Sequence, residues 1–184
     1  MKNELPKRKH PRLESFDYSS AGAYFITICT QNRRCVLSRI VEKMVPAKST
    51  GTDSVGRGLA PAEMYDIEYS KFGKIAEQQL LILKKRYSFL SVDHYVIMPN
   101  HIHAIFCLNN QAAGASPRPT IMDIVCAYKS LTIKECKKLG FTEKLFQTSF
   151  HEHIIRGHED YEEIAKYICE NPIRWHYDEL YSEE

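Results

Sequence analysis

The chain has 184 residues, of which 43% are hydrophobic and 26% charged, and its formal net charge is +2. This length and composition fit one soluble globular domain with a sizeable core. No segment approaches the roughly 18 apolar residues that a membrane helix needs. The N-terminal residues 1–9 lack the apolar core of a secretion signal. We therefore expect a cytoplasmic protein with no membrane association.

The distribution of charge is more informative than its sum. A basic N-terminal arm (residues 1–20) contains Arg8, Lys9 and Arg12, and Arg33 and Arg34 follow the first apolar segment. Basic groups of this kind suit a polyanionic partner, although a solvated surface explains any single one equally well. The six cysteines form no Cys-x-x-Cys pair, so we expect buried thiols rather than disulfides or a zinc knuckle.

The first half of the chain alternates extended and helical patterns. Residues 23–30 are aromatic and β-branched and predict a strand, whereas residues 33–40 are a short continuation of uncertain type. Residues 46–58 are rich in turn formers and lie in a flexible insertion, about 42–62. Apolar residues at helical spacing predict a helix over 75–87, and two strands follow at 92–98 and 101–108.

The second half continues the alternation. Residues 109–117 predict a loop and residues 120–138 a helix that Gly140 stops. A strand is expected at 150–156, and a last helix over 159–170 ends before Pro172. This order predicts a single domain over 1–184 with an α+β, ferredoxin-like (βαββαβ) antiparallel sheet and an additional C-terminal helix.

Two histidines on the second strand of the central pair are the most informative feature. His101 and His103 are separated by one residue, and a strand alternates its side chains between two faces. Both imidazoles are therefore expected on one face, where they can bind a divalent metal without completing its coordination shell. Ordinary sheet histidines are the alternative. A nucleotide hydrolase would need a third alternating histidine, and position 105 is Ile105, so that function is disfavoured. A metallohydrolase of a small phosphorylated substrate is a further alternative.

The last helix offers a tyrosine and an amide for the same site. Tyr161 lies in the middle of its apolar stripe, so we expect it to pack in the core. Tyr167 lies roughly 120° away, on the flank of the buried face. Asn171 follows one turn later on that flank. A phenol is a competent oxygen nucleophile once deprotonated, and two imidazoles with an amide oxygen leave open metal positions for a phosphate. Mg²⁺ or Mn²⁺ fits this mixed donor set.

These residues resemble a known family. The segment 95–103 with its His-hydrophobic-His motif, the segment 147–156, and the helix end from Tyr167 to Pro172 are similar to the REP-associated tyrosine transposases. That family belongs to the single-tyrosine transposases of small insertion sequences. The resemblance runs from about Arg12 to Trp175. The insertion and the loop after the third strand depart from the pattern, which bears on DNA contacts more than on chemistry.

The resemblance implies cleavage and strand transfer of single-stranded DNA beside a hairpin, with a divalent metal. Tyr167 would be the catalytic nucleophile, giving a 5′-phosphotyrosine and a free 3′ hydroxyl, and His101, His103 and Asn171 would hold the metal. A non-catalytic nucleic-acid-binding module on the same sheet is the alternative. Monomer or homodimer, and action of the tyrosine helix within one chain or on a partner, remain open. The expected DNA contacts are Arg8, Lys9, Arg12, Arg33, Arg34, Lys129, Gln147, His153 and Arg156.

Overall fold

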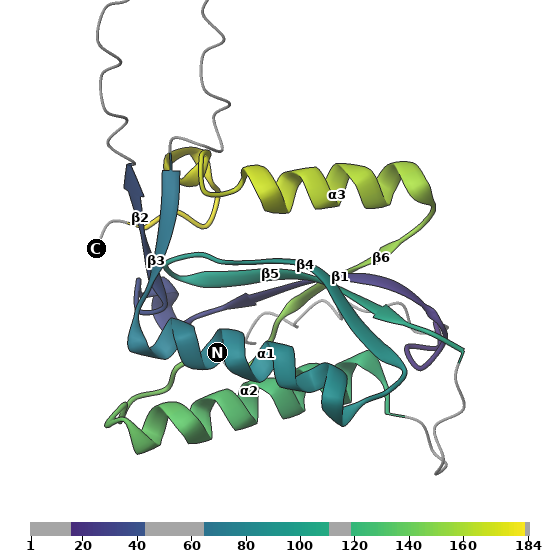
Figure 1. Ribbon diagram of the computed structural model, residues 1–184, viewed down its shortest axis with the longest axis horizontal. Coiled ribbons are helices and arrows are strands. Elements are labelled where there is room, and N and C mark those ends of the chain that lie inside the picture. Colours follow the sequence, from purple (N-terminus) through teal and green to yellow (C-terminus); the bar gives the residue numbers. More distant parts are fainter. Residues whose placement is uncertain (1–15, 43–64, 111–118, 183–184) are drawn as a thin grey trace, which may run out of the picture.

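A computed structural model of the chain describes residues 16–42, 65–110 and 119–182. Its core is a four-stranded sheet in the spatial order β4-β5-β1-β6, in which every neighbouring pair is antiparallel (Figure 1). The strands are β1 (Gly22–Cys29), β4 (Leu90–Ile97), β5 (His101–Leu108) and β6 (His151–Ile155). The long helices are α1 (Lys71–Arg86), α2 (Ile121–Lys138) and α3 (His158–Glu170).

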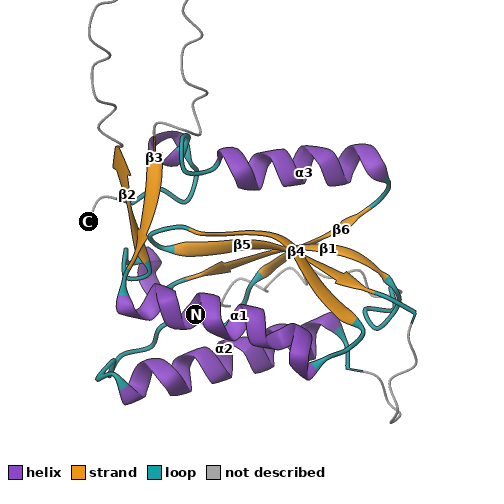
Figure 2. Ribbon diagram, in the orientation of Figure 1, coloured by secondary structure: helices purple, strands orange, loops and turns teal. Residues whose placement is uncertain are grey.

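The helices cover both faces of the sheet. Helices α1 and α2 lie against one face and α3 against the other (Figure 2). Seven of the eight residues of β5 are consequently buried, including the two histidines. Two apolar clusters result, one under α1 and α2 and one under α3. The chain order β1-α1-β4-β5-α2-β6, followed by α3, confirms the predicted ferredoxin-like α+β fold with an extra C-terminal helix.

Local sequence sets the helix ends near the predicted positions. The Ser70 hydroxyl caps α1 by accepting from the Phe72 and Gly73 amides, and Thr120 and Asp123 form a reciprocal capping box at α2. After α2 the chain turns at Gly140, whose φ of +85° is a left-handed conformation that glycine adopts without strain. Helix α3 ends at Glu170, directly before Asn171 and Pro172.

A two-stranded ribbon was not predicted. Strands β2 (Ser38–Glu42) and β3 (Tyr65–Tyr69) pair antiparallel, and in Figure 1 they stand beside the C-terminal end of α3. Ile40 and Ile67 from this ribbon pack with Ile168 and Trp175 in the cluster under α3. The predicted flexible insertion between the two strands and most of the predicted loop after β5 lie outside the described residues. No described helix is long and apolar enough to cross a membrane.

Candidate active site

His101 and His103 lie side by side on β5, on the face that α3 covers. Their ring centroids are 4.4 Å apart, and the side chains are 0% and 2% exposed. His101 Nδ1 lies 2.8 Å from Asn100 Oδ1, and His103 Nδ1 lies 2.9 Å from the Thr27 hydroxyl on the neighbouring strand β1. Both Nδ1 atoms are thus engaged by neighbours. The two Nε2 atoms therefore remain available for contacts in the space between the sheet and α3.

Burial keeps both imidazoles neutral. Removal from water lowers the pKa of His101 to about 3, and the same effect, with a smaller contribution from the neighbouring His101, lowers the pKa of His103 to about 3. The Asn171 amide raises the pKa of His101 and the Asp178 carboxylate raises the pKa of His103, but burial outweighs both effects. A neutral imidazole keeps a lone pair on one ring nitrogen, which is the form that binds metals.

Tyr167 brings a phenol to this pair from α3. Its hydroxyl lies 3.3 Å from His103 Nε2 and 3.5 Å from Asp178 Oδ2, and its ring contacts the Phe25 ring edge-on. The side chain is 39% exposed, so the flank position predicted from the helical spacing is where the structure places it. Burial of the hydroxyl, followed by the Asp178 charge, raises the pKa of Tyr167 to about 12. The free protein therefore holds a protonated phenol at neutral pH.

Tyr161, in contrast, is directed to a different polar group. Its hydroxyl donates to Asp93 Oδ2 on β4 at 3.0 Å, and its ring packs in the cluster under α3. Cys107 on β5 also donates to this carboxylate, at 3.2 Å. Burial and the Asp93 hydrogen bond raise the pKa of Tyr161 to about 12. The two tyrosines of α3 thus contact different polar groups. Of the two, only Tyr167 contacts the pair formed by His101 and His103.

Asn171 is a buried amide whose oxygen has no hydrogen-bond partner among the described residues. The residue is 1% exposed, and its Nδ2 donates to Asp178 Oδ2 at 2.9 Å. Its Oδ1 and His101 Nε2 are buried, and neither has a hydrogen-bond partner among the described residues. Buried polar atoms are nearly always paired, so an unpaired nitrogen and oxygen acceptor beside the His103 imidazole calls for a ligand that accepts lone pairs. A divalent cation fits this donor set.

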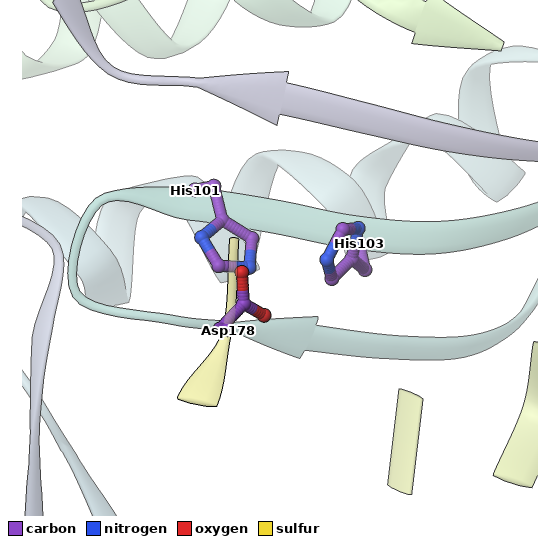
Figure 3. A group of neighbouring side chains, drawn as sticks. All are labelled: His101, His103 and Asp178. Carbon is purple, nitrogen blue, oxygen red and sulfur yellow. The ribbon is translucent and has the colours of Figure 1, made fainter. Parts of the chain in front are cut away.

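Asp178 is the residue that sequence reasoning missed. It follows the short 3-10 turn Trp175–Tyr177, and its carboxylate points at the imidazole pair (Figure 3). One potential ligand atom from each of His101, His103 and Asp178 lies within 4.8 Å of the others. These three side chains form a candidate metal site. No periodic spacing relates Asp178 to the helix before it, so the sequence carried no signal for it beyond an acidic residue near the chain end.

A cavity of about 660 Å³ opens beside Tyr167. Its wall includes two arginines, Arg33 and Arg174, and the exposed His151. Tyr177, which is 91% exposed, also lines it. The residues that line it are Phe25, Thr27, Arg33, His103, His151, Tyr167, Asn171, Arg174, Tyr177, Asp178, Glu179 and Leu180. The cavity is large enough to admit part of a nucleotide chain next to the phenol.

The expected DNA contacts are scattered around this site. Arg33 lines the cavity and donates to the Glu179 carbonyl at 3.1 Å, whereas Arg34 is paired with Glu143. His153 pairs with Asp160 at 2.9 Å. The remaining positions are Gln147 and Arg156, which lie outside the cavity lining, and Arg8, Lys9 and Arg12, which lie outside the described residues.

Lys129, which was expected to contact DNA, is buried against the loop before β6. Its side chain is 8% exposed, and its ammonium donates to the carbonyls of Gln147, Thr148 and Ser149 at 2.6, 2.9 and 3.5 Å. An ammonium has three N–H donors, and the loop uses all of them. The ammonium is therefore engaged by the loop in the structure described, and the phosphate contact of Lys129 stays a prediction. The side chain fixes the loop that leads into β6.

Known structures with a similar fold include that of a transposase. The structure matches that of a REP-associated tyrosine transposase bound to a REP hairpin, with a TM-score of 0.54 and 19% identity over 89% of this chain and 74% of the other. This match confirms, at the level of the fold, the resemblance predicted from the sequence. A candidate transposase from Deinococcus radiodurans superposes with a TM-score of 0.45 and 15% identity, over 85% of this chain and 94% of that one.

Sequence comparison gives a relative but no activity. An uncharacterized protein of Haemophilus influenzae is 28% identical over 189 aligned positions, which cover 95% of this chain and 93% of the relative. No protein-family model matches the chain. The fold is similar to that of the tyrosine transposase structure, and the chemistry has to be argued from the site.

Proposed function

We propose that this protein cleaves and rejoins single-stranded DNA beside a hairpin, through a covalent bond between Tyr167 and the DNA, with a divalent metal. One observation carries the proposal: the Tyr167 hydroxyl lies 3.3 Å from Nε2 of His103, at a buried site that also holds the unpaired acceptors of His101 and Asn171. A nucleophile next to cation ligands is the arrangement that phosphoryl transfer needs.

The DNA substrate is proposed from two independent supports. The REP-associated tyrosine transposase with the same fold is bound to a REP hairpin. In this chain, the cavity beside Tyr167 has Arg33 and Arg174 in its wall, and guanidinium groups are suited to binding phosphate. A hairpin held outside the cavity, with its flanking single strand entering it, would bring a phosphodiester to the phenol.

The chemical step balances as a transesterification. The Tyr167 oxygen attacks phosphorus, the bond from phosphorus to the 3′ oxygen breaks, and a 5′-phosphotyrosine and a free 3′ hydroxyl result. The Asp178 carboxylate, 3.5 Å from the phenol oxygen, is placed to accept the phenol proton, and solvent supplies a proton to the leaving 3′ oxygen. Because one ester replaces another, the 3′ hydroxyl of a second strand can reverse the step without an external energy source.

The residues that would hold the metal are His101, His103 and Asn171, with Asp178 as a further oxygen donor in reach. Bound there, a divalent cation such as Mg²⁺ or Mn²⁺ would polarise the phosphoryl oxygens and offset the charge that develops on them. Tyr167 is protonated at neutral pH in the free protein, and the rise of its pKa to about 12 means that a base has to take its proton during the attack.

The decisive experiment incubates the protein with a labelled single-stranded hairpin oligonucleotide and Mg²⁺ or Mn²⁺. We expect a protein–DNA adduct that survives denaturation and is lost in Tyr167→Phe. Tyr161→Phe is the matched control, since Tyr161 lies on the same helix but bonds to Asp93. An adduct that survives Tyr167→Phe would overturn the mechanism, and a salt-sensitive mobility shift without any adduct would indicate a binding module instead.

A further inference from the structure

Asn100 is a buried amide that connects the histidine pair to the C-terminal segment of the chain. The residue is 0% exposed, and its Oδ1 lies 2.8 Å from His101 Nδ1. On the other side, its Nδ2 donates to the Leu180 carbonyl at 2.7 Å, to the Ser182 hydroxyl at 2.9 Å and to the Arg33 carbonyl at 3.3 Å. The amide therefore lies between a candidate metal ligand and two other parts of the backbone.

The partners of this amide decide which way it faces. Oxygen and nitrogen of an asparagine amide have nearly the same shape, so hydrogen-bond chemistry has to distinguish them. The carbonyls of Leu180 and Arg33 only accept hydrogen bonds, so they require the NH₂ group of Asn100 on their side. The amide oxygen must then face His101.

The orientation of the amide in turn decides where the His101 proton lies. An amide oxygen only accepts, so His101 Nδ1 has to carry the hydrogen that it shares with Asn100 Oδ1. A neutral imidazole has one N–H and one lone pair, which places the lone pair on Nε2. That is the buried atom that has no partner among the described residues.

His103 does not have the same constraint. Its Nδ1 lies 2.9 Å from the Thr27 hydroxyl, which can donate or accept. Its Nε2 faces the Tyr167 hydroxyl, which can also do either. Either tautomer of His103 is therefore satisfied, whereas only one tautomer of His101 is.

We propose that Asn100 is a positioning residue that holds His101 as the Nδ1–H tautomer, with its Nε2 lone pair aimed at the metal position before any cation binds. The C-terminal segment takes part through Leu180 and Ser182, because it fixes the orientation of the amide. Metal binding then requires no proton shift on His101. The inference rests on the proposed function only in taking His101 Nε2 as a metal ligand.

Nitrogen NMR of the metal-free protein tests the tautomer directly. In protein with ¹⁵N-labelled histidine, long-range proton–nitrogen correlations distinguish a protonated ring nitrogen from one with a lone pair, and the missing signal in His101→Gln assigns the residue. We expect the proton of His101 on Nδ1. A proton on Nε2 in the wild-type protein would overturn the proposal without any variant.

Two substitutions separate a positioning role from a structural one. Asn100→Ala removes the acceptor, and we expect His101 to populate the Nε2–H tautomer and Mn²⁺ affinity, measured by electron paramagnetic resonance, to fall by about tenfold to a hundredfold. Asn100→Asp keeps the acceptor, so the tautomer should persist even if affinity changes. Thr27→Val is the control that leaves the His101 tautomer unchanged.

The outcomes distinguish this inference from the proposed function. An unchanged His101 tautomer and unchanged Mn²⁺ affinity in Asn100→Ala would overturn the positioning role. If Asn100→Ala does not fold, the wild-type spectrum and Asn100→Asp still decide, because a loss of the Nδ1–H tautomer in Asn100→Asp contradicts the proposal. Neither readout involves DNA, so an adduct that survives Tyr167→Phe would remove the cleavage mechanism and leave this result standing.

Discussion

The Tyr167 hydroxyl lies 3.3 Å from Nε2 of His103 on the same chain. The helix that carries the tyrosine packs against β4 and β5 of its own sheet, with Ala165 and Ile168 buried beneath it. In this arrangement the phenol and both imidazoles meet within one polypeptide. In the single chain described, α3 thus lies over its own sheet, which is the arrangement expected for a tyrosine helix that acts within its own chain.

The carboxylate of Asp178 is expected to contribute to the raised pKa of this phenol. Burial first and the Asp178 charge second raise the pKa of Tyr167 to about 12. Asp178→Asn removes the charge, so we expect the pKa of Tyr167 in metal-free protein to fall toward 10, its usual value. Titration of ¹³C-labelled tyrosine followed by NMR, with the signal assigned through Tyr167→Phe, measures this. Asp93→Asn, which alters the surroundings of Tyr161 instead, should leave Tyr167 unchanged.

The buried histidines predict how the stability of the metal-free protein depends on pH. Their pKa values are lowered to about 3 in the folded state, whereas an unfolded histidine titrates near 6.5. As the pH falls below about 6.5, the unfolded chain takes up protons that the folded protein does not, so the free energy of unfolding decreases. The slope is at most about 1.4 kcal/mol per pH unit for each histidine.

Urea unfolding between pH 7 and pH 5 measures this slope. His101→Asn removes one titrating group, and its amide can still donate to Asn100, so we expect a shallower loss of stability than in the wild type. His158→Asn, which removes an exposed imidazole on α3, is the matched control. Identical slopes for the wild type and His101→Asn would show that burial does not hold this imidazole neutral.

Local periodicity was enough to predict four of the five side chains of the candidate site, all except Asp178. Alternation along a strand placed His101 and His103 on one face, and the turn of a helix placed Tyr167 and Asn171 on one flank. Both relationships are fixed by backbone geometry over a few residues. The structure brings these two pairs together, because α3 covers the face of β5 that carries the histidines.

The remaining features of the fold and the site depend on contacts between segments that are distant in the sequence. Such contacts leave no local pattern from which they could be predicted. Asp178 reaches the histidines only because the chain turns back after α3. Strands β2 and β3 pair across the insertion between them, and neither has enough alternation to predict a partner. Lys129 was expected to contact DNA, but its ammonium donates hydrogen bonds to the carbonyls of the loop over 147–149, which no local pattern predicts.

Gly73 is expected to be essential for packing α1 against the segment before β2. A Cβ atom at this position would lie 2.0 Å from the Leu37 carbonyl oxygen, which also accepts a hydrogen bond from the Ser70 amide. Backbone on both sides would have to move, so Gly73→Ala should destabilise the protein by at least about 2 kcal/mol, despite the higher helix propensity of alanine. Thermal unfolding measures the change. Gln78→Ala, at an exposed position of the same helix, should be within about 0.5 kcal/mol of the wild type.

A substitution of Lys129 can distinguish a structural role of this side chain from a DNA contact. Lys129→Met keeps the length of the side chain but leaves the carbonyls of Gln147 and Thr148 without their donor. We expect a loss of about 2 kcal/mol in the free energy of unfolding, since hydrogen bonds from a charged group are among the stronger ones. The salt dependence of binding to a single-stranded hairpin, measured without metal, should not change.

Arg33→Gln is the matched variant for that experiment, because Arg33 lines the cavity beside Tyr167. If Arg33 contacts one phosphate, its loss should reduce the slope of log affinity against log salt by about 0.7, the value for one phosphate on a single strand. The same reduction in Lys129→Met, with unfolding unaffected, would return Lys129 to the DNA interface. The two variants together therefore assign each cation either to the loop or to the nucleic acid.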